Sequence, residues 1–168
     1  MKMKIFALTL CLALLIVPFS SIGVFADGAT DLGYTVDETA KTYTVTTADG
    51  LLAVAALVNA GTTDYNITLA ADIDLAGKTW TSIGTSSNAY KGVFDGANFT
   101  IKNLTYVIEK TDENVAKKNV YVSLIGKANE GCAVKNLKIT GFNLQGVEFV
   151  SAVIGKIEQF KDNPYKIV

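Results

Sequence analysis

The sequence contains no histidine and no arginine among its 168 residues. Without histidine, neither a serine–histidine nor a cysteine–histidine nucleophile pair can be assembled. Nor is there an imidazole to bind zinc or to act as a base near neutral pH. These two absences exclude most hydrolytic mechanisms and leave carboxylates and lysines as the main ionisable groups.

Cysteine is nearly absent, since only Cys11 and Cys132 are present. Cys11 lies in an apolar segment that we expect to be removed, which leaves Cys132 alone. An intramolecular disulfide is then impossible. We interpret Cys132 as a small buried thiol rather than a reactive one.

The segment 1–26 has the pattern of a secretory signal peptide. Lys2 and Lys4 precede an apolar run over 5–17, and Val24-Phe25-Ala26 fits the small-x-small rule for cleavage after Ala26. The alternative is a membrane anchor, but a span needs about 20 apolar residues. A lipoprotein site at Cys11 would need a small residue before it. The sequence therefore predicts secretion, with no membrane span after cleavage.

The remaining chain, 27–168, has the length of one ordinary domain. It carries 13 lysines against 16 acidic residues, a net charge of −3. No basic patch stands out along it. We therefore expect no nucleic-acid partner.

The region 27–62 predicts a β-hairpin followed by a capping helix. Two β-rich runs, 34–36 and 43–45, flank a polar five-residue loop. Thr47 is a plausible N-cap, and a strongly apolar helical pattern covers 48–59 before Gly61. A helix this apolar suits a cap over the open end of a sheet structure.

From residue 63 the hydrophobic period changes to two, which is typical of strands. Turn residues recur between the apolar runs, and we expect strands near 67–75, 99–108, 119–125, 133–140 and 147–154. We find no convincing helix beyond Ala60. The chain is therefore predicted to be mainly β.

Two internal repeats run through this region. Ile101-Lys102-Asn103-Leu104 returns further along the chain as Val134-Lys135-Asn136-Leu137. "YVSLIGK" at 121–127 also returns as "FVSAVIGK" at 149–156, with one residue added. Both spacings fall within the periods of about 20 to 50 residues that are typical of solenoids. We expect each repeated asparagine to bond its equivalent in the next coil.

The segments "LLAVAALVNAG", "ITLAADIDLAGKTWTSIG" and "YKGVFDGANFTIKNLT" resemble the start of bacterial secreted or surface β-helix proteins that carry GLUG motifs. "SLIGKANEGCAVKNLKITG" is similar to one GLUG unit. The resemblance covers roughly 51–157 and implies a right-handed parallel β-helix (a solenoid) over 63–168, in adhesin-like proteins. It implies no catalytic residues.

The sequence departs from this pattern after Lys156, where no further repeat follows. The β-helix would then be incomplete at its C-terminus, as a free-standing product or as a fragment of a longer protein. An uncapped end exposes strand edges, which predicts possible self-association.

Three acids are the candidate site residues: Asp72, Asp74 and Asp95. Asp72 and Asp74 share one strand face, so their carboxylates could converge on calcium. The alternative is that they are solvent-facing, with Asp95 starting a turn. Paired carboxylates could also serve a glycoside hydrolase, but lyases of β-helix architecture commonly use arginine, which is absent.

Trp80 and Tyr90, with Tyr106 and Tyr121, could stack on sugar rings if they are exposed. The alternative for Trp80 is a core or cap residue. The charged segment 109–119 is predicted to be a solvated loop between coils, suited to variable contacts.

Three functions follow from these observations. The first is a secreted or cell-surface module, not an enzyme and without a cofactor, that serves adhesion or display by binding host or cell-wall glycans or surface proteins. The second is a polysaccharide-active enzyme or a fragment of one. The third is a structural spacer in a larger surface protein.

Overall fold

The computed structural model describes residues 31–111, 113 and 120–158. Every element below belongs to the unit that begins at Asp31. The signal peptide, most of the charged segment and the stretch 159–168 lie outside the described residues. The predictions for them stay predictions.

The chain opens with the expected hairpin, formed by β1 (Tyr34–Asp37) and β2 (Thr42–Val45). The two strands pair antiparallel, with Tyr34 opposite Val45. Asp37 Oδ1 closes the turn by accepting the N–H groups of Thr39 at 2.9 Å and Ala40 at 2.8 Å. This prediction is confirmed.

The helix α1 (Ala48–Ala60) follows the hairpin directly. The Thr47 side chain accepts the N–H of Gly50 at 3.1 Å, a cap worth about 1 kcal/mol. Gly61 ends the helix at φ 137°, and its N–H donates to the Leu57 and Val58 carbonyls. Both predicted caps are confirmed, and the apolar face of α1 is buried as Leu51, Val54, Ala55 and Val58.

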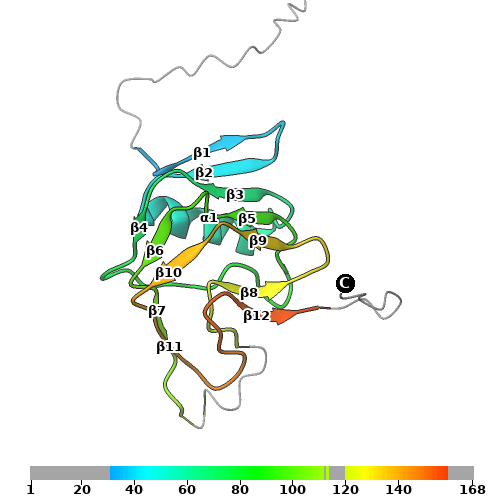
Figure 1. Ribbon diagram of the computed structural model, residues 1–168. Coiled ribbons are helices and arrows are strands. Elements are labelled where there is room, and N and C mark those ends of the chain that lie inside the picture. The colour runs from blue at the N-terminus through cyan, green and yellow to red at the C-terminus, as the bar shows by residue number, and fades with distance from the viewer. Residues whose placement is uncertain (1–30, 112, 114–119, 159–168) are drawn as a thin grey trace, which may run out of the picture. The chain divides into compact units, whose positions relative to one another are not determined.

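Short strands make up the rest of the fold, as Figure 1 shows. They are two to four residues long and join into small sheets. In chain order they are β3 (Asn66–Leu69), β4 (Ile73–Asp74), β5 (Val93–Asp95), β6 (Thr100–Lys102), β7 (Thr105–Val107), β8 (Ile125–Ala128), β9 (Ala133–Lys135), β10 (Lys138–Thr140), β11 (Asn143–Gln145) and β12 (Ile154–Ile157).

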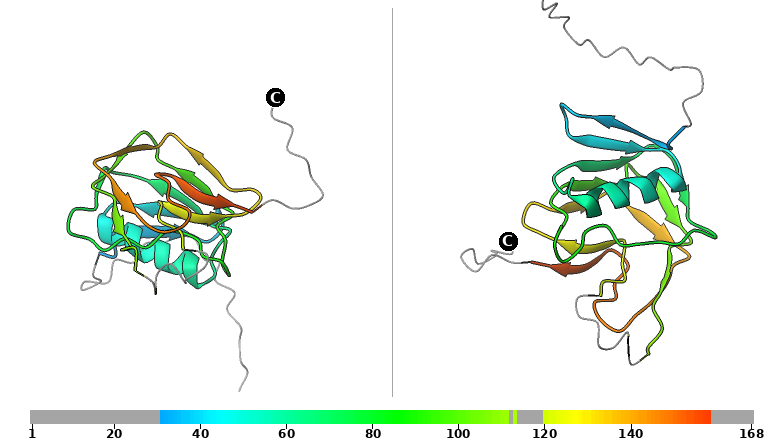
Figure 2. Two further views of the ribbon diagram at one scale, coloured as in Figure 1. Left: turned by 90° about the horizontal axis from the view of Figure 1, so that it is seen from below. Right: turned by 180° about the vertical axis from the view of Figure 1, so that it is seen from behind.

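The prediction of a right-handed parallel β-helix is wrong, although the mainly β composition is as expected. The described strands form four separate sheets, ordered β1-β2-β3-β5-β9, β10-β6-β4, β11-β7 and β12-β8. The first sheet is mixed because β1 and β2 are antiparallel, whereas the other pairs are parallel. The helix also lies alongside β3 and β5, not beyond an end of the sheet (Figures 1 and 2).

The steps along the chain between paired strands are unequal. Ile67 pairs with Phe94, and Phe94 pairs with Val134, so the second step along the chain is much longer than the first. In the three-stranded sheet, the step from Ile101 to its partner Ile139 is likewise longer than the step from Ile73 to Ile101. The paired strands therefore do not follow one fixed period along the chain.

The two sequence repeats differ in whether their copies pair with each other in the structure. The Ile101 and Val134 copies of the first repeat do not pair with each other, because Val134 lies beside Phe94 instead. The second repeat does stack in register. Val122 bridges Val150 and Ile125 pairs with Ile154, so the residue added between them is accommodated in the turn.

The paired strands and the helix share one hydrophobic core. Ile67 and Phe94 are fully buried in the largest sheet, and Ile73 and Ile101 are fully buried in the three-stranded sheet. Full burial of such a side chain contributes about 1.5–3 kcal/mol. The strands β9 to β12, at the outer edges of their sheets, carry only partly buried apolar residues such as Ile139.

Candidate functional site

Asp72, the first of the three candidate acids, joins two strands. Its Oδ1 accepts the N–H of Thr100 at 2.9 Å, and its Oδ2 lies 2.9 Å from Lys102 Nζ. The bond from Lys102, followed by that from Thr100, lowers the pKa of Asp72. The carboxylate therefore stabilises the contact between β4 and β6.

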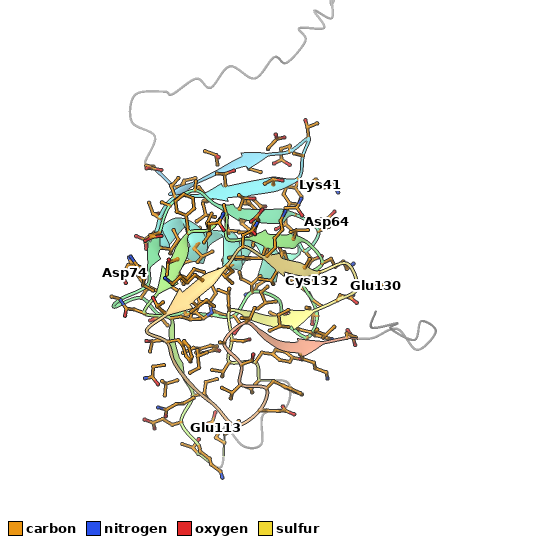
Figure 3. The ribbon with its side chains drawn as sticks, in the orientation of Figure 1. Lys41, Asp64, Asp74, Glu113, Glu130 and Cys132 are labelled. Atoms are coloured by element: carbon orange, nitrogen blue, oxygen red, sulfur yellow. The ribbon has the colours of Figure 1, made fainter. Side chains whose placement is uncertain are left out.

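Asp74 lies at the corner that follows β4. Its Oδ1 accepts a hydrogen bond from Nδ2 of Asn103 at 2.8 Å and another from the backbone N–H of Ala76 at 2.9 Å. These two bonds, with Asn103 the larger contributor, lower the pKa of Asp74. Figure 3 shows Asp74 at the edge of the molecule, far from the labelled Glu130.

Asp95 repeats this arrangement at the end of β5. Its Oδ1 accepts the N–H of Ala97 at 2.9 Å and Nδ2 of Asn136 at 3.0 Å. Its Oδ2 lies 3.1 Å from Lys135 Nζ. The Ala97 bond is the largest cause of the lowered pKa of Asp95, followed by that of Asn136.

The two repeated asparagines therefore bond to aspartates, and the prediction that they bond to each other is wrong. Asn103 and Asn136 have φ values of 57° and 50°, in the left-handed region that asparagine tolerates better than most residues. Among the described residues, no group of three acids, cysteines or histidines is arranged to hold a metal. The three acids are placed as strand-joining groups, and the calcium expectation gains no support from their positions.

Trp80 and Tyr90 do not present a ring to solvent, which corrects the expectation that they contact a ligand. Trp80 is 1% exposed, and its Nε1 donates to the Ser123 carbonyl at 2.9 Å. Tyr90 is fully buried, and its hydroxyl donates to the Val93 carbonyl at 3.2 Å. Burial raises the pKa of Tyr90 well above its ordinary value. Both rings belong to the core.

A groove of about 550 Å³ opens beside Trp80, over the segment 81–87. Its described lining combines hydroxyl groups with two tyrosines and has no charged side chain. We call it the hydroxyl groove. It is lined by Thr81, Ser82, Gly84, Thr85, Ser86, Ser87, Tyr106, Ile108, Val120 and Tyr121.

The helix C-terminus holds the loop of this groove in place. Asn59 Oδ1 accepts the N–H of Gly84 at 2.7 Å, and the Asn59 carbonyl accepts Nδ2 of Asn88 at 2.7 Å. Inside the loop, Thr85 Oγ1 accepts the N–H of Asn88 at 3.1 Å. Gly84, at φ 85°, lies so close to the Lys127 carbonyl that a Cβ would come within 2.3 Å of it.

A nearly buried lysine supports the same loop from beneath. Lys127 is 8% exposed, and its Nζ donates to the Ser86 carbonyl at 3.2 Å. Its charge is matched by Glu158, whose Oε2 lies 2.7 Å away. This ion pair lowers the pKa of Glu158. Sequence reasoning missed the supporting roles of Asn59 and Lys127, because neither residue is near the loop in the chain.

Sequence reasoning also missed the groove itself. The sequence predicts turn residues at Gly84 and at 86–88, and 86–88 do form a bend in the structure. Four consecutive small polar residues around Ser86 are the signal that could have indicated a hydroxyl-lined surface. Tyr106 and Tyr121 were considered as ligand contacts, and both line the groove.

A second groove, of about 490 Å³, lies among the edge strands and is mostly apolar. Its apolar lining residues are Val134, Leu137, Ile139 and Phe142, with Ala152 and Val153 from the turn before β12, and Lys135 and Asn136 also line it. Phe142 is 54% exposed. Residues of the edge strands β9 and β10 line it, so we expect this groove to favour self-association.

Comparison with known proteins gives one partial similarity. The chain is 30% identical over 110 residues to a protein named Halomucin from Haloquadratum walsbyi (strain DSM 16790 / HBSQ001). The match covers 58% of this chain and 1% of the relative, so the chain spans only a small part of that protein's length. This similarity is consistent with a surface module. No family model and no solved structure matches the chain.

No helix among the described residues is long and apolar enough to cross a membrane. The helix α1 has 13 residues.

Proposed function

We propose that the chain is a secreted or cell-surface module, not an enzyme, that serves adhesion or surface display. The observation that carries the proposal is the partial similarity to Halomucin, which fits a module within a much longer surface protein. The predicted signal peptide at 1–26 adds to it. The hydroxyl groove supplies a place where such a module can contact a ligand.

The lowered pKa values of the three candidate acids favour this function over a polysaccharide hydrolase. A glycosidase needs one carboxyl group whose pKa is raised, so that it still holds a proton when it acts as the acid. The pKa values of Asp72, Asp74 and Asp95 are all lowered, and each carboxylate is hydrogen-bonded. These residues serve better as structural links than as an acid–base pair.

A structural spacer is the second candidate, because the matched segment makes up only 1% of its relative. In that case the module would hold other parts of a long protein away from the cell and would bind nothing itself. Ligand binding therefore separates the two candidates.

The first test is where the protein is found. Intact producing cells are labelled with an antibody against the chain, before and after mild protease treatment, and the culture medium is blotted. We expect labelling that protease removes, or protein in the medium. Protein found only in the cytoplasm would overturn the proposal.

Adhesion is tested with beads that carry the purified chain from residue 27. We expect these beads to bind whole cells or cell-wall preparations more than beads coated with heat-denatured chain. A surface protein whose beads bind nothing would instead fit the spacer.

A further inference from the structure

We infer that the hydroxyl groove is a binding site for a neutral glycan. This inference rests on the proposed function, because it names the ligand class of the same surface module. The groove offers side-chain hydroxyls from Thr81, Thr85, Ser86 and Ser87, and its volume is within the range of ligand sites. None of its described lining residues carries a charge.

The loop that supplies the hydroxyls is held more firmly than an exposed turn requires. Asn59 fixes it at both Gly84 and Asn88, and Lys127 fixes the Ser86 carbonyl from below. A loop already held in its binding conformation loses little conformational entropy when a ligand binds. These contacts hold the loop in one conformation before any ligand arrives.

The charges around the loop favour a neutral ligand over an anionic one. Lys127 contacts the loop, but its Nζ already bonds to the Ser86 carbonyl and to Glu158. An anionic sugar or a phosphate would therefore meet no free cation in the described lining. Each hydroxyl of an uncharged sugar can both donate and accept a hydrogen bond, and the hydroxyls of the groove can do the same.

The two tyrosines give the groove an aromatic wall. Tyr106, on β7, is half-buried and is the ring that a ligand can reach. Tyr121 is only 7% exposed, and its hydroxyl lies 3.4 Å from Ser86 Oγ. Phe149 packs against the Tyr121 ring, at a centroid distance of 5.3 Å, and supports it from behind. A tyrosine combines an apolar ring face with a polar tip, which suits the C–H face and the hydroxyl rim of a sugar ring. A peptide would instead need apolar pockets for its side chains, and in the described lining only Ile108 and Val120 supply aliphatic side chains.

The test measures binding of the purified chain from residue 27 to defined oligosaccharides. The neutral probes are mannotriose, cellotetraose, laminaritetraose and chitotetraose. The charged probe is tetragalacturonate, and the peptide probe is an alanine-glycine octapeptide. Saturation-transfer NMR detects binding, and isothermal titration calorimetry measures the dissociation constant. We expect at least one neutral probe to bind, and the charged and peptide probes not to bind.

Variants then locate the binding. Tyr106→Ala should weaken the neutral probe about tenfold or more, whereas Tyr106→Phe should retain most of the affinity that the ring supplies. Ser87→Ala removes one hydroxyl at the groove and should weaken binding less than Tyr106→Ala does. Tyr34→Ala is the matched control, because Tyr34 is also a half-buried strand tyrosine but lies outside the groove. It should leave the dissociation constant unchanged.

Folding is checked for each variant by the fluorescence of the buried Trp80 and by the thermal midpoint. If Tyr106→Ala does not fold, Ser87→Ala still locates the site. The inference is overturned if no neutral probe binds at millimolar concentration, if only the charged or peptide probe binds, or if all groove variants bind like the wild type. None of these results affects the surface-labelling test, so failure of this inference is distinguishable from failure of the proposed function.

Discussion

Asn103 Nδ2 donates a 2.8 Å hydrogen bond to Asp74 Oδ1 across the corner between neighbouring strands. Asn136 makes the same contact with Asp95, at 3.0 Å. In both cases the asparagine has a positive φ and the aspartate also accepts the N–H two residues further along. The repeated Lys-Asn-Leu sequence therefore forms the same kind of corner twice, once at each of two different sheets.

We therefore expect Asn103→Ala to destabilise the fold by about 1–3 kcal/mol, because it removes a hydrogen bond and places alanine at a left-handed φ. Asn103→Gly should cost less, since glycine adopts this φ freely. Asn143→Ala, within strand β11, is the control. Urea denaturation followed by Trp80 fluorescence measures all three. Equal losses for alanine and glycine would show that backbone conformation does not matter at this corner.

Local structure could be predicted from the sequence where it depends on residues that are close together in the chain. The hairpin, the Thr47 and Gly61 caps and the helix between them all follow from neighbouring residues, and all are confirmed. The 121–127 and 149–156 echo also predicted a real register, because both copies fill the same position in paired strands.

The long-range arrangement could not be predicted in the same way. The Lys-Asn-Leu repeat suggested a stacking period, but pairing of Phe94 with Val134 depends on the loops between strands, whose lengths differ. The expected strand at 99–108 is divided into β6 and β7 because Asn103 turns the backbone. The groove depends on Asn59 and Lys127 reaching one loop from distant positions, which no local pattern reports.

Lowering the pH should destabilise the fold, because the pKa values of three of its carboxyl groups are lowered in the folded chain. The pKa values of Asp72, Asp74 and Asp95 are below the ordinary value of 3.8, so the folded chain binds fewer protons than the unfolded chain. The stability they contribute is fully present above about pH 5 and is lost as the pH falls through their folded pKa values. Because the chain has no histidine, the unfolding free energy should change little between about pH 6 and 8.

Urea midpoints measured from about pH 2 to 8 test this expectation. Asp95→Asn should flatten the acid limb, whereas Glu130→Gln, at an exposed loop position, should leave its slope unchanged. An acid limb that is identical in the wild type and Asp95→Asn would contradict the assignment.

The two leucines of the repeat should differ in their importance for stability. Leu104 is fully buried, whereas Leu137 is partly buried and lines the apolar groove among the edge strands. Leu104→Asp places a charge in the core and should prevent folding. Leu104→Ala should cost about 2–5 kcal/mol, and Leu137→Ala should cost less.

Urea denaturation of the two alanine variants measures the difference. The Trp80 emission maximum reports whether each variant retains the buried tryptophan. If Leu137→Ala is as damaging as Leu104→Ala, the edge strands contribute more to the core than their exposure indicates.

Cys132 should react slowly with thiol reagents in the folded chain. The thiol is partly buried, and burial raises its pKa to about 11. Because only the thiolate is nucleophilic, little of the reactive form is present at neutral pH. Labelling with a maleimide at neutral pH should be several times slower in buffer than in concentrated urea, as followed by intact mass. Equal rates would mean that Cys132 is as accessible in the folded chain as in the unfolded one.

Self-association should involve the edge strands β9, β10, β11 and β12, each of which ends its sheet. An unpaired strand edge beside an apolar groove favours pairing with another chain, and a second copy presents the same features. Phe142 is the most exposed large apolar residue of this groove, so Phe142→Lys should reduce the dimer fraction. Val36→Lys, at the opposite edge of the five-stranded sheet, is the control and should not change it.

Sedimentation velocity from micromolar to millimolar chain concentration measures the oligomeric state. A wild-type chain that stays monomeric throughout this range would contradict the prediction. A loss of dimer with Val36→Lys alone would show that the dimer contact lies at the hairpin instead.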